Sequence, residues 1–300
     1  SVMVHITGIF DIIASRLAHL TPQEISAVKW ASDRLGVECT RLHQLELLLA
    51  KHKLPFDISV RMLTDLPSTA QLKSDIPFKM DSLITRTGQK VAERRETCWM
   101  AEDGIGSLAY SGKFMAPVPF SPSVRRIRDE LFEKTNIRYD CCLINYYPDG
   151  DSACKWHTDP DHGRLWSLEE AVVSVGETRR FNLRQLTGAN EDLDQYSYYV
   201  CSGDVMHMFA DCQDRFEHCV LKGEGQQNCG PRISFVFKQA LLQASGKRGH
   251  GAPLQSFVGA ESQDAPRKFV LPANKKKQKH GSKSKSTLAK HSRKTATHKR

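Results

Sequence analysis

A histidine and an aspartate lie two positions apart in the stretch NYYPDGDSACKWHTDPD, which spans residues 145–161. In an extended segment, residues i and i+2 point to the same side, so His157 and Asp159 can both face an interior while Thr158 faces away. His218, in the later stretch RFEHC, is the candidate for a third ligand. Two histidines and one carboxylate form a set that binds Fe(II) and leaves the opposite coordination face open. A polar turn is the alternative explanation of the His-x-Asp pair taken alone.

Other side chains near this set could also bind a metal. His207, in GDVMHMF, is the alternative to His218 as the third ligand, and we expect His162 to be exposed in a turn. Four later cysteines could instead suggest zinc together with His207 and His218, but their separations of eleven, seven and ten residues fit no usual zinc motif. The cysteines that we interpret as buried or incidental thiols are Cys201, Cys212, Cys219 and Cys229.

Short segments with the composition of β-strands begin near residue 95. They are rich in β-branched and aromatic residues and are separated by turns such as Pro148-Asp149-Gly150. The predicted strands are residues 141–147, 170–176, 180–186, 196–209, 216–221 and 232–238. Many short strands without long helices between them predict an all-β sandwich or jelly roll. Val124, Ile127 and Leu131 share one helical face, which predicts a helix at residues 123–134.

The first seventy or so residues have a helical pattern. Thr21-Pro22-Gln23-Glu24 is a capping box with proline at the first helical position, and apolar residues follow at helical spacing until Gly36. A second, leucine-rich helix is predicted at residues 42–49, whereas residues 67–77 are predicted to be a linker. We expect three regions, which are a helical extension over residues 1–75, the main domain over 76–245, and a disordered segment with a basic tail over 246–300.

The net charge of +9 is concentrated at one end of the chain. Residues 275–300 contain nine lysines, two arginines and no acidic residue, so the other 274 residues together carry −2. A segment with so few apolar residues cannot offset the entropy of ordering, and we expect it to be disordered. Such a tail could bind phosphates nonspecifically, or it could serve as a nuclear import signal or a solubilising segment.

Residues 2–20 are largely apolar, but Asp11, Arg16 and two histidines interrupt them and no basic segment precedes them. We therefore expect neither a signal peptide nor a membrane span. The nine cysteines include no Cys-x-x-Cys pair, so neither a disulfide framework nor a zinc knuckle is indicated. This composition favours a reducing compartment, the nucleus or the cytoplasm.

Two further motifs flank the three candidate ligands and complete an ordered set. Asn145-Tyr146-Tyr147 comes before them, and Arg232-Ile233-Ser234-Phe235-Val236-Phe237-Lys238 comes after them. This order resembles the AlkB family of Fe(II)- and 2-oxoglutarate-dependent dioxygenases, whose pattern is N-x-Y, H-x-D, a distal H and R-x-N-x-T-x-R. Tyr110-Ser111-Gly112 and residues 144–150 and 174–181 are similar to the eukaryotic DNA-repair branch of that family.

The resemblance covers residues 94–240 and implies a mainly β fold, a double-stranded β-helix of the jelly-roll type with flanking helices. It implies that His157, Asp159 and His218 are the catalytic residues and bind Fe(II). Arg232 would bind the distal carboxylate of 2-oxoglutarate, because a guanidinium is permanently charged and can donate two parallel hydrogen bonds. The resemblance further implies that Tyr147 donates to the same carboxylate.

Other positions of the implied 2-oxoglutarate site are Asn145, Ser234 and Lys238. Asn145 would contact the cosubstrate at its metal-bound end. Ser234 and Lys238 stand where the family pattern has asparagine and arginine, and Val236 replaces a threonine. Lysine keeps the charge of arginine but loses its planar fork, so we expect 2-oxoglutarate to bind with altered affinity.

Substrate contacts are expected from Tyr110, Ser111 and Asp161. In the family, an aromatic residue at the position of Tyr110 stacks on the substrate base, although an ordinary sheet tyrosine is the alternative. Asp161 would either orient a substrate amine or cap the turn. Trp99 and Trp156 are interpreted as packing residues. The arginines that could contact phosphates, or form a solvated face, are Arg94, Arg95, Arg125, Arg126, Arg128, Arg179 and Arg180.

The combined expectation is a monomeric dioxygenase that uses Fe(II), 2-oxoglutarate and O2 to remove methyl groups from bases of methylated DNA or RNA. Such a base must be single-stranded or flipped out of a duplex to reach a buried metal. One alternative is an oxygenase that modifies protein side chains, since the same iron chemistry permits it. The other is a catalytically weakened nucleic-acid-binding protein.

Overall fold

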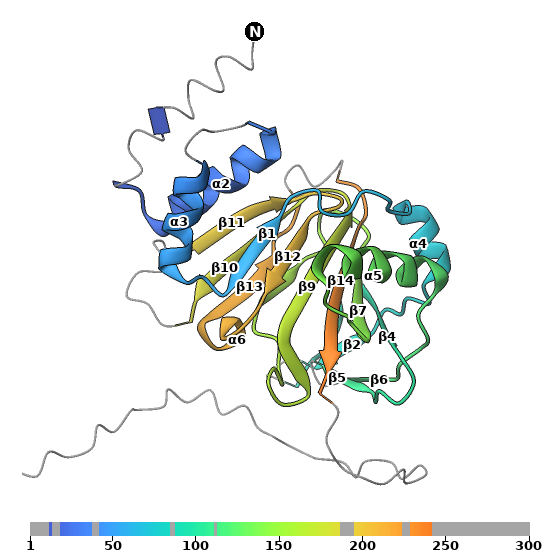
Figure 1. Ribbon diagram of the computed structural model, residues 1–300. Helices are drawn as coiled ribbons and strands as arrows, with labels where there is room; N and C mark the ends of the chain where they lie inside the picture. Colours follow the sequence, from blue (N-terminus) through green and yellow to red (C-terminus); the bar gives the residue numbers. More distant parts are fainter. Residues whose placement is uncertain are drawn as a thin grey trace, which may run out of the picture. The chain divides into compact units, whose positions relative to one another are not determined.

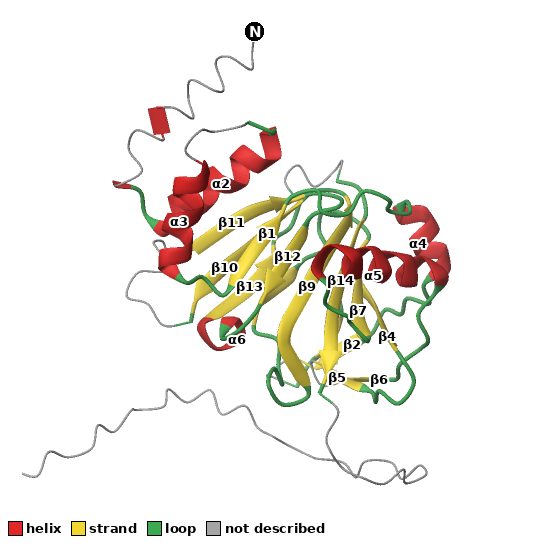
Figure 2. Ribbon diagram, viewed as in Figure 1, coloured by secondary structure: helices red, strands yellow, loops and turns green. Residues whose placement is uncertain are grey.

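The computed structural model describes residues 12–13, 19–37, 42–84, 88–110, 113–186, 195–223 and 229–241. Residues 1–245 form one compact unit, and residues 246–300 form a second unit that lies outside the described residues. The predicted disordered segment and basic tail therefore lie there too. The first unit consists of two antiparallel sheets that face each other with helices around them, so the predicted jelly roll is confirmed (Figures 1 and 2).

The larger sheet has six strands, and most of the predicted runs fall within it or its partner. In spatial order its strands are β1 (Phe56–Ser59), β12 (Val205–Met208), β9 (Trp166–Gly176), β14 (Arg232–Ala240), β7 (Cys141–Tyr147) and β4 (Glu96–Ala101). The predicted run at residues 196–209 is divided, because the turn at residues 201–204 separates β11 from β12. Glycine is needed in that turn, since Gly203 has a φ of 89°.

The smaller sheet has four strands and closes the other side of the jelly roll. Its strands are β11 (Gln195–Val200), β10 (Arg179–Gln185), β13 (Phe216–Val220) and β8 (Cys154–His157), and the short helix α6 (Cys212–Arg215) precedes β13. Two hairpins complete the described strands, which are β2 (Ser82–Ile84) with β3 (Lys90–Ala92), and β5 (Leu108–Tyr110) with β6 (Lys113–Met115).

Side-chain alternation on β7 and β14 separates the site from the outer core. The two strands pair with Asn145 opposite Ser234 and Tyr147 opposite Arg232. These polar side chains line a cavity between the sheets, whereas Ile144 and other alternate residues belong to an apolar cluster with α5. Because the side chains of a strand alternate between faces, a run of seven residues supplies both the site and the core.

Helix α5 (Pro122–Thr135) covers the outer face of the larger sheet (Figure 2). Ser121 caps its N-terminus by accepting a hydrogen bond from the backbone N–H of Val124, and Asn136 ends it in the left-handed conformation with φ 56°. Val124, Ile127 and Leu131 are fully buried, as the sequence predicted. This helix therefore buries the face of the sheet that does not carry the site.

The segment at residues 67–77 is not a linker, so that prediction is wrong. It contains helix α4 (Thr69–Asp75), whose N-terminus is capped by the Ser68 hydroxyl. Leu72 is fully buried in the cluster that includes α5. A helix of two turns is too short to show periodicity, and tertiary packing stabilises it.

Helices α2 (Pro22–Leu35) and α3 (Leu42–His52) form as predicted, with the capping box of Thr21 and Glu24 present. The Ser26 and Tyr198 hydroxyls lie 2.5 Å apart, which joins α2 to β11. The region at residues 1–75 is not helical throughout, because β1 pairs with β12 in the larger sheet. Among the described residues, no helix is both long and apolar enough to cross a bilayer.

Candidate active site

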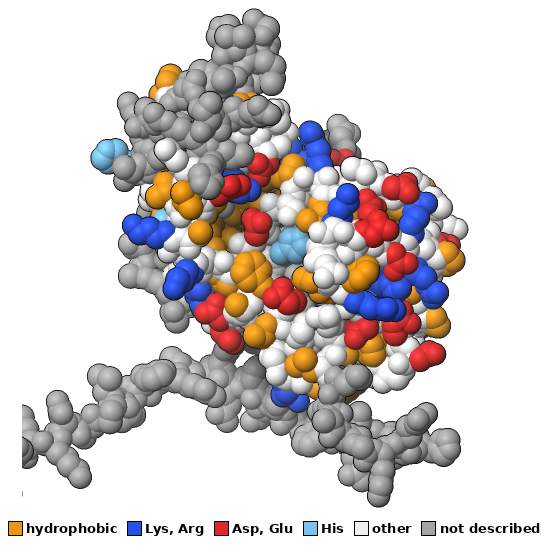
Figure 3. All heavy atoms as spheres, in the orientation of Figure 1, with side chains coloured by type: hydrophobic (Ala, Val, Ile, Leu, Met, Phe, Trp, Pro, Cys, Tyr) orange, Lys and Arg blue, Asp and Glu red, His pale blue; other side chains and the backbone are white. Residues whose placement is uncertain are grey.

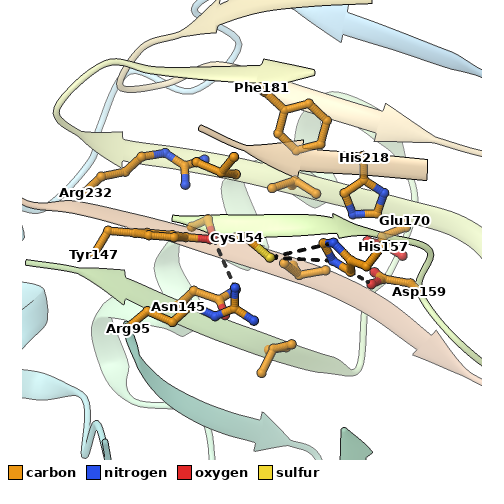
Figure 4. A pocket seen from close by; sticks show the side chains of 15 residues that line it. Arg95, Asn145, Tyr147, Cys154, His157, Asp159, Glu170, Phe181, His218 and Arg232 are labelled. Atoms are coloured by element: carbon orange, nitrogen blue, oxygen red, sulfur yellow. Dashed lines mark hydrogen bonds and ion pairs between the residues drawn. The ribbon is translucent and has the colours of Figure 1, made fainter. Parts of the chain in front are cut away.

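A cavity lies between the inner faces of the two sheets, and polar side chains form its two ends (Figure 4). His157, Asp159 and His218 are at one end, and Arg232 and Tyr147 are at the other. The apolar side chains along its walls are Leu143, Val172, Phe181, Val220 and Val236. The cluster of possible metal ligands and the buried cation Arg232 therefore lie at opposite ends of one cavity.

Neighbouring strands bring the three possible ligands together. His157 ends β8 and lies directly opposite His218 on β13, and their ring centroids are 4.3 Å apart. Asp159 follows β8, and its Oδ1 lies 3.5 Å from Nε2 of His157. One donor atom from each residue lies within 4.8 Å of the others. Donors this close can surround one divalent ion at roughly 2.0–2.2 Å.

The orientation of His157 fits metal binding through Nε2. Its Nδ1 lies 2.8 Å from the backbone oxygen of Lys155, so Nδ1–H donates there and Nε2 faces Asp159. Burial lowers the pKa of His157, but Cys154 and Asp159 oppose that effect and raise it to about 9. A metal ion must therefore displace the Nε2 proton when it binds.

The other two ligand candidates are already in the form that a metal requires. Burial and the neighbouring His157 lower the pKa of His218 to about 3, so its imidazole is neutral near pH 7. Burial raises the pKa of Asp159, but Lys238 and the two histidines outweigh it and hold that pKa well below its usual range. A neutral imidazole and an ionised carboxylate are both competent donors.

Arg232 provides the buried cation at the opposite end. Its side chain is fully buried, and its guanidinium lies 5.2 Å from the centroid of the Tyr147 ring. Nη2 donates to Ser174 Oγ at 2.9 Å, whereas Nε and Nη1 have no hydrogen-bond partner among the described residues. Unpaired buried donors on a charged group are costly unless an anion meets them. The arrangement therefore fits a carboxylate such as the distal one of 2-oxoglutarate.

Asn145 and Ser234 lie along the cavity between its ends. Asn145 Nδ2 donates to Ser234 Oγ at 3.3 Å, and its Oδ1 has no partner within the described part of the chain. Serine at position 234 therefore keeps a polar contact with Asn145 although the family pattern has asparagine there.

Lys238 is at the metal end of the cavity and not beside Arg232. Its Nζ lies 2.9 Å from Asp159 Oδ2 and 2.5 Å from Glu170 Oε2. Arg232 and Lys238 are six residues apart on an extended strand, so their Cα atoms are roughly 20 Å apart. The predicted contact of Lys238 with 2-oxoglutarate stays a prediction, and in this structure the lysine is paired with two buried carboxylates.

Glu170 and His162 are parts of the site that the sequence did not indicate. Glu170 lines the cavity and is almost fully buried, directly opposite Lys238 in the pairing of β9 with β14. His162 was predicted to be exposed, and this is wrong because its side chain is 6% exposed and its Nε2 lies 2.7 Å from Glu170 Oε2. Gly163, with a φ of 71°, follows His162 in the turn before β9.

Arg95 and Cys154 also line the cavity. Arg95 was a candidate phosphate contact, but it is 5% exposed and its Nε lies 3.2 Å from Glu93 Oε1. Cys154 Sγ lies 3.7 Å from His157 Nδ1. Burial raises the pKa of the Cys154 thiol, but Arg95 and His157 lower it to about 7.

The proposed substrate residues are only partly described. Tyr110 ends β5, but its side chain and the whole of Ser111 lie outside the described residues. Asp161 has a φ of 67° and accepts a hydrogen bond from Arg164 Nε at 3.0 Å, and it does not line the cavity. These contacts favour the alternative in which Asp161 stabilises the turn.

Two candidate phosphate contacts and one candidate metal ligand have other partners or lie elsewhere. Arg179 is fully buried and donates to the backbone oxygens of Asp149 and Gly230, and Arg128 forms ion pairs with Glu102 and Asp129. Neither is available for phosphate. His207 is not part of any cluster of possible ligands, because in the described part of the chain the only such cluster of histidine, cysteine and acidic side chains is His157, Asp159 and His218.

Comparison with known proteins agrees with this geometry. Residues 66–238 match the model of the 2OG-Fe(II) oxygenase superfamily, so the chain belongs to that family. Its members use Fe(II), 2-oxoglutarate and O2, and this chain is an AlkB-like member. The cluster of His157, Asp159 and His218 is of the kind that such a metal requires.

The similar proteins include a viral and several eukaryotic ones. The chain is 35% identical over 171 residues to the uncharacterized protein R406 of Acanthamoeba polyphaga mimivirus, covering 56% of this chain and 85% of that protein. It is 28% identical over 177 residues to the human alpha-ketoglutarate-dependent dioxygenase alkB homolog 3, covering 56% and 59% of the two chains. It is 27% identical over 223 residues to the DNA oxidative demethylase ALKBH2 of Arabidopsis thaliana, covering 66% and 68%. A solved structure, that of OsALKBH1, superposes with a TM-score of 0.45 at 14% identity, covering 62% of this chain and 99% of that one.

Proposed function

We propose that this protein is an oxidative N-demethylase of methylated bases in DNA or RNA. The observation that supports it most is one cavity with His157, Asp159 and His218 at one end and the unpaired donors of Arg232 at the other. The names of the relatives, alkB homolog 3 and DNA oxidative demethylase, support the choice of substrate class. We further propose that the protein acts as a monomer in the nucleus, the cytoplasm or both.

In this proposal the three ligands hold Fe(II) and Arg232 binds the distal carboxylate of 2-oxoglutarate, assisted by Tyr147. When bound, iron, 2-oxoglutarate and O2 supply an oxidation in which 2-oxoglutarate becomes succinate and CO2, and the N-methyl group is hydroxylated and leaves as formaldehyde. Asn145 would contact the cosubstrate at the end nearer the metal ligands. The protein supplies positioning and electrostatics and leaves the oxidation to the cofactors.

The walls of the cavity keep water from the reacting atoms. Phe181 stacks on His218 with ring centroids 5.5 Å apart, and Val172 and Val236 are largely buried between the two ends. Fixed apolar walls hold the ligand rings in one orientation and strengthen the charge interactions inside the cavity. Tyr110 and Ser111 are proposed to contact the substrate base, which has to be unpaired to reach the cavity.

The test is succinate release that depends on Fe(II) and 2-oxoglutarate, measured with methylated single-stranded DNA, RNA, duplex DNA and methylated peptides. We expect stimulation by a methylated nucleic acid, with little by the peptides and none by unmethylated controls. The variant His218→Ala should be inactive with every substrate. Stimulation by a peptide alone would replace the nucleic-acid proposal with a protein-modifying one, and absence of any turnover would leave a binding protein.

A further inference from the structure

A chain of four buried charged or polar side chains extends from the metal end of the cavity. His162 Nε2 lies 2.7 Å from Glu170 Oε2, which lies 2.5 Å from Lys238 Nζ, which lies 2.9 Å from Asp159 Oδ2. The side chains are 10% exposed or less. Figure 4 shows Glu170 beside Asp159 at the same end of the cavity as the two histidines.

Charge balance explains why Lys238 needs a partner. An ammonium group in contact with Asp159 competes with a metal ion for that carboxylate, and burial strengthens the competition because the dielectric is low. The charges of Asp159 and Lys238 alone would sum to zero. Glu170 adds one negative charge, so Asp159, Lys238 and Glu170 together carry −1 once a divalent cation has displaced the proton of His157.

The two carboxylate oxygens of Asp159 also have different partners. Lys238 contacts Oδ2, whereas Oδ1 lies toward Nε2 of His157. Only Oδ1 is therefore directed to the metal position, which favours a carboxylate that binds through one oxygen. Lys238 and His162 both contact Oε2 of Glu170, which restrains a second carboxylate that lines the same cavity.

We propose that Glu170 and Lys238 are positioning residues that act as a pair, with Lys238 orienting Asp159 and Glu170 cancelling the repulsion between Lys238 and the metal ion. The inference rests on the proposed metal site at His157, Asp159 and His218. Glu170 and Lys238 are directly paired in the register of β9 with β14, so the strand pairing itself brings their side chains together.

The test uses the purified full chain and measures Mn(II) binding by calorimetry, together with the absorption spectrum of bound Co(II), which reports coordination number. Glu170→Gln should weaken Mn(II) binding by about 10- to 100-fold, as losses beside metal ligands usually do. Lys238→Met should bind Mn(II) at least as tightly as the wild type, because the competing cation is gone. Its Co(II) spectrum should change as Asp159 and Glu170 lose their restraint.

A loss of affinity in Glu170→Gln but not in Lys238→Met separates this proposal from a structural role, since a loss of packing would weaken metal binding in both variants. Lys238→Arg keeps the charge and should bind Mn(II) like the wild type. The matched control is Glu169→Gln, which removes the same charge from the exposed neighbour of Glu170 and should change nothing. The double variant Glu170→Gln with Lys238→Met restores a net charge of −1 and should recover affinity lost in Glu170→Gln. Thermal unfolding without metal checks that each variant is folded.

The outcomes distinguish the two claims. Wild-type binding of one Mn(II) that is lost in His218→Ala supports the metal site itself. If that holds but Glu170→Gln binds Mn(II) and Co(II) like the wild type, the inference about the pair is overturned and the proposed function stands. A wild type that binds no divalent metal would overturn both.

Discussion

At the scale of residues, two buried cations on one strand have different surroundings. Arg232 has unpaired donors that point into the cavity, whereas Lys238 is paired with Asp159 and Glu170. Under the proposed function, only Arg232 therefore gains a partner when 2-oxoglutarate binds. The difference follows from position along β14 and not from charge, since both side chains are cationic.

This difference predicts the order of two substitutions. With Mn(II) saturating, Arg232→Met should weaken 2-oxoglutarate binding by roughly 30- to 5,000-fold, which corresponds to about 2–5 kcal/mol for a buried charge that loses its partner. Lys238→Met should weaken it less. Calorimetric titration with 2-oxoglutarate checks the order. A larger loss in Lys238→Met would mean that the proposed position of 2-oxoglutarate beside Arg232 is wrong.

At the scale of elements, one turn connects α2 to the larger sheet. Asp204 is fully buried just before β12 and accepts hydrogen bonds from the backbone N–H groups of Arg61 and Cys201, at 2.9 and 2.7 Å. It also forms an ion pair with Arg34 near the end of α2. A single carboxylate therefore joins the N-terminal helices, the segment after β1 and the strand β12.

Asp204→Ala should consequently destabilise the fold by about 2–4 kcal/mol, because it leaves two N–H groups and a guanidinium without their acceptor. Asp33→Ala is the matched control, since Asp33 pairs with Lys29 on the surface of α2 and should cost only about 0.3–0.5 kcal/mol. Urea unfolding measures both. Equal, small losses would show that α2 is not held by this turn.

The sequence predicts those elements whose signal is local. The strand at residues 141–147 and the helix near residues 123–134 were predictable because alternation and helical spacing extend over the whole element. Helix α4 was missed because two turns show no period, and β1 because four residues between helices resemble a loop. In both cases packing against a distant part of the chain decides the structure.

The metal end of the site was predictable for the same reason, and its surroundings were not. His157 and Asp159 share one short extended segment, so their common direction follows from spacing. Glu170 and Lys238 are 68 residues apart and meet through the register of two strands, which no local pattern determines. His162 was misjudged because a polar residue in a turn is usually exposed.

At the scale of the whole molecule, the basic charge is concentrated in residues 275–300. Residues 1–274 carry −2 and residues 275–300 carry +11. On the face shown in Figure 3, acidic and basic side chains are interspersed over α4 and α5 and do not form one basic patch. Because residues 275–300 carry +11, nonspecific attraction to a nucleic acid should come mainly from the tail.

Deletion of residues 275–300 should weaken nonspecific binding to DNA and RNA and reduce its dependence on salt concentration, while 2-oxoglutarate turnover stays intact. Every proposed site residue lies outside the deleted segment. Fluorescence anisotropy with unmethylated oligonucleotides at several salt concentrations measures the slope. An unchanged slope would show that the tail does not contact phosphates and would favour a role in nuclear import.

The most direct test of the central claim is the stoichiometry of a single reaction. The protein is incubated with Fe(II), 2-oxoglutarate and an N-methylated single-stranded oligonucleotide, and succinate, formaldehyde and loss of the methyl group are quantified together. We predict equal molar amounts of all three, and none of them with the variant Asp159→Ala. Succinate formation that is the same with and without the oligonucleotide, and leaves the methyl group in place, would contradict the account.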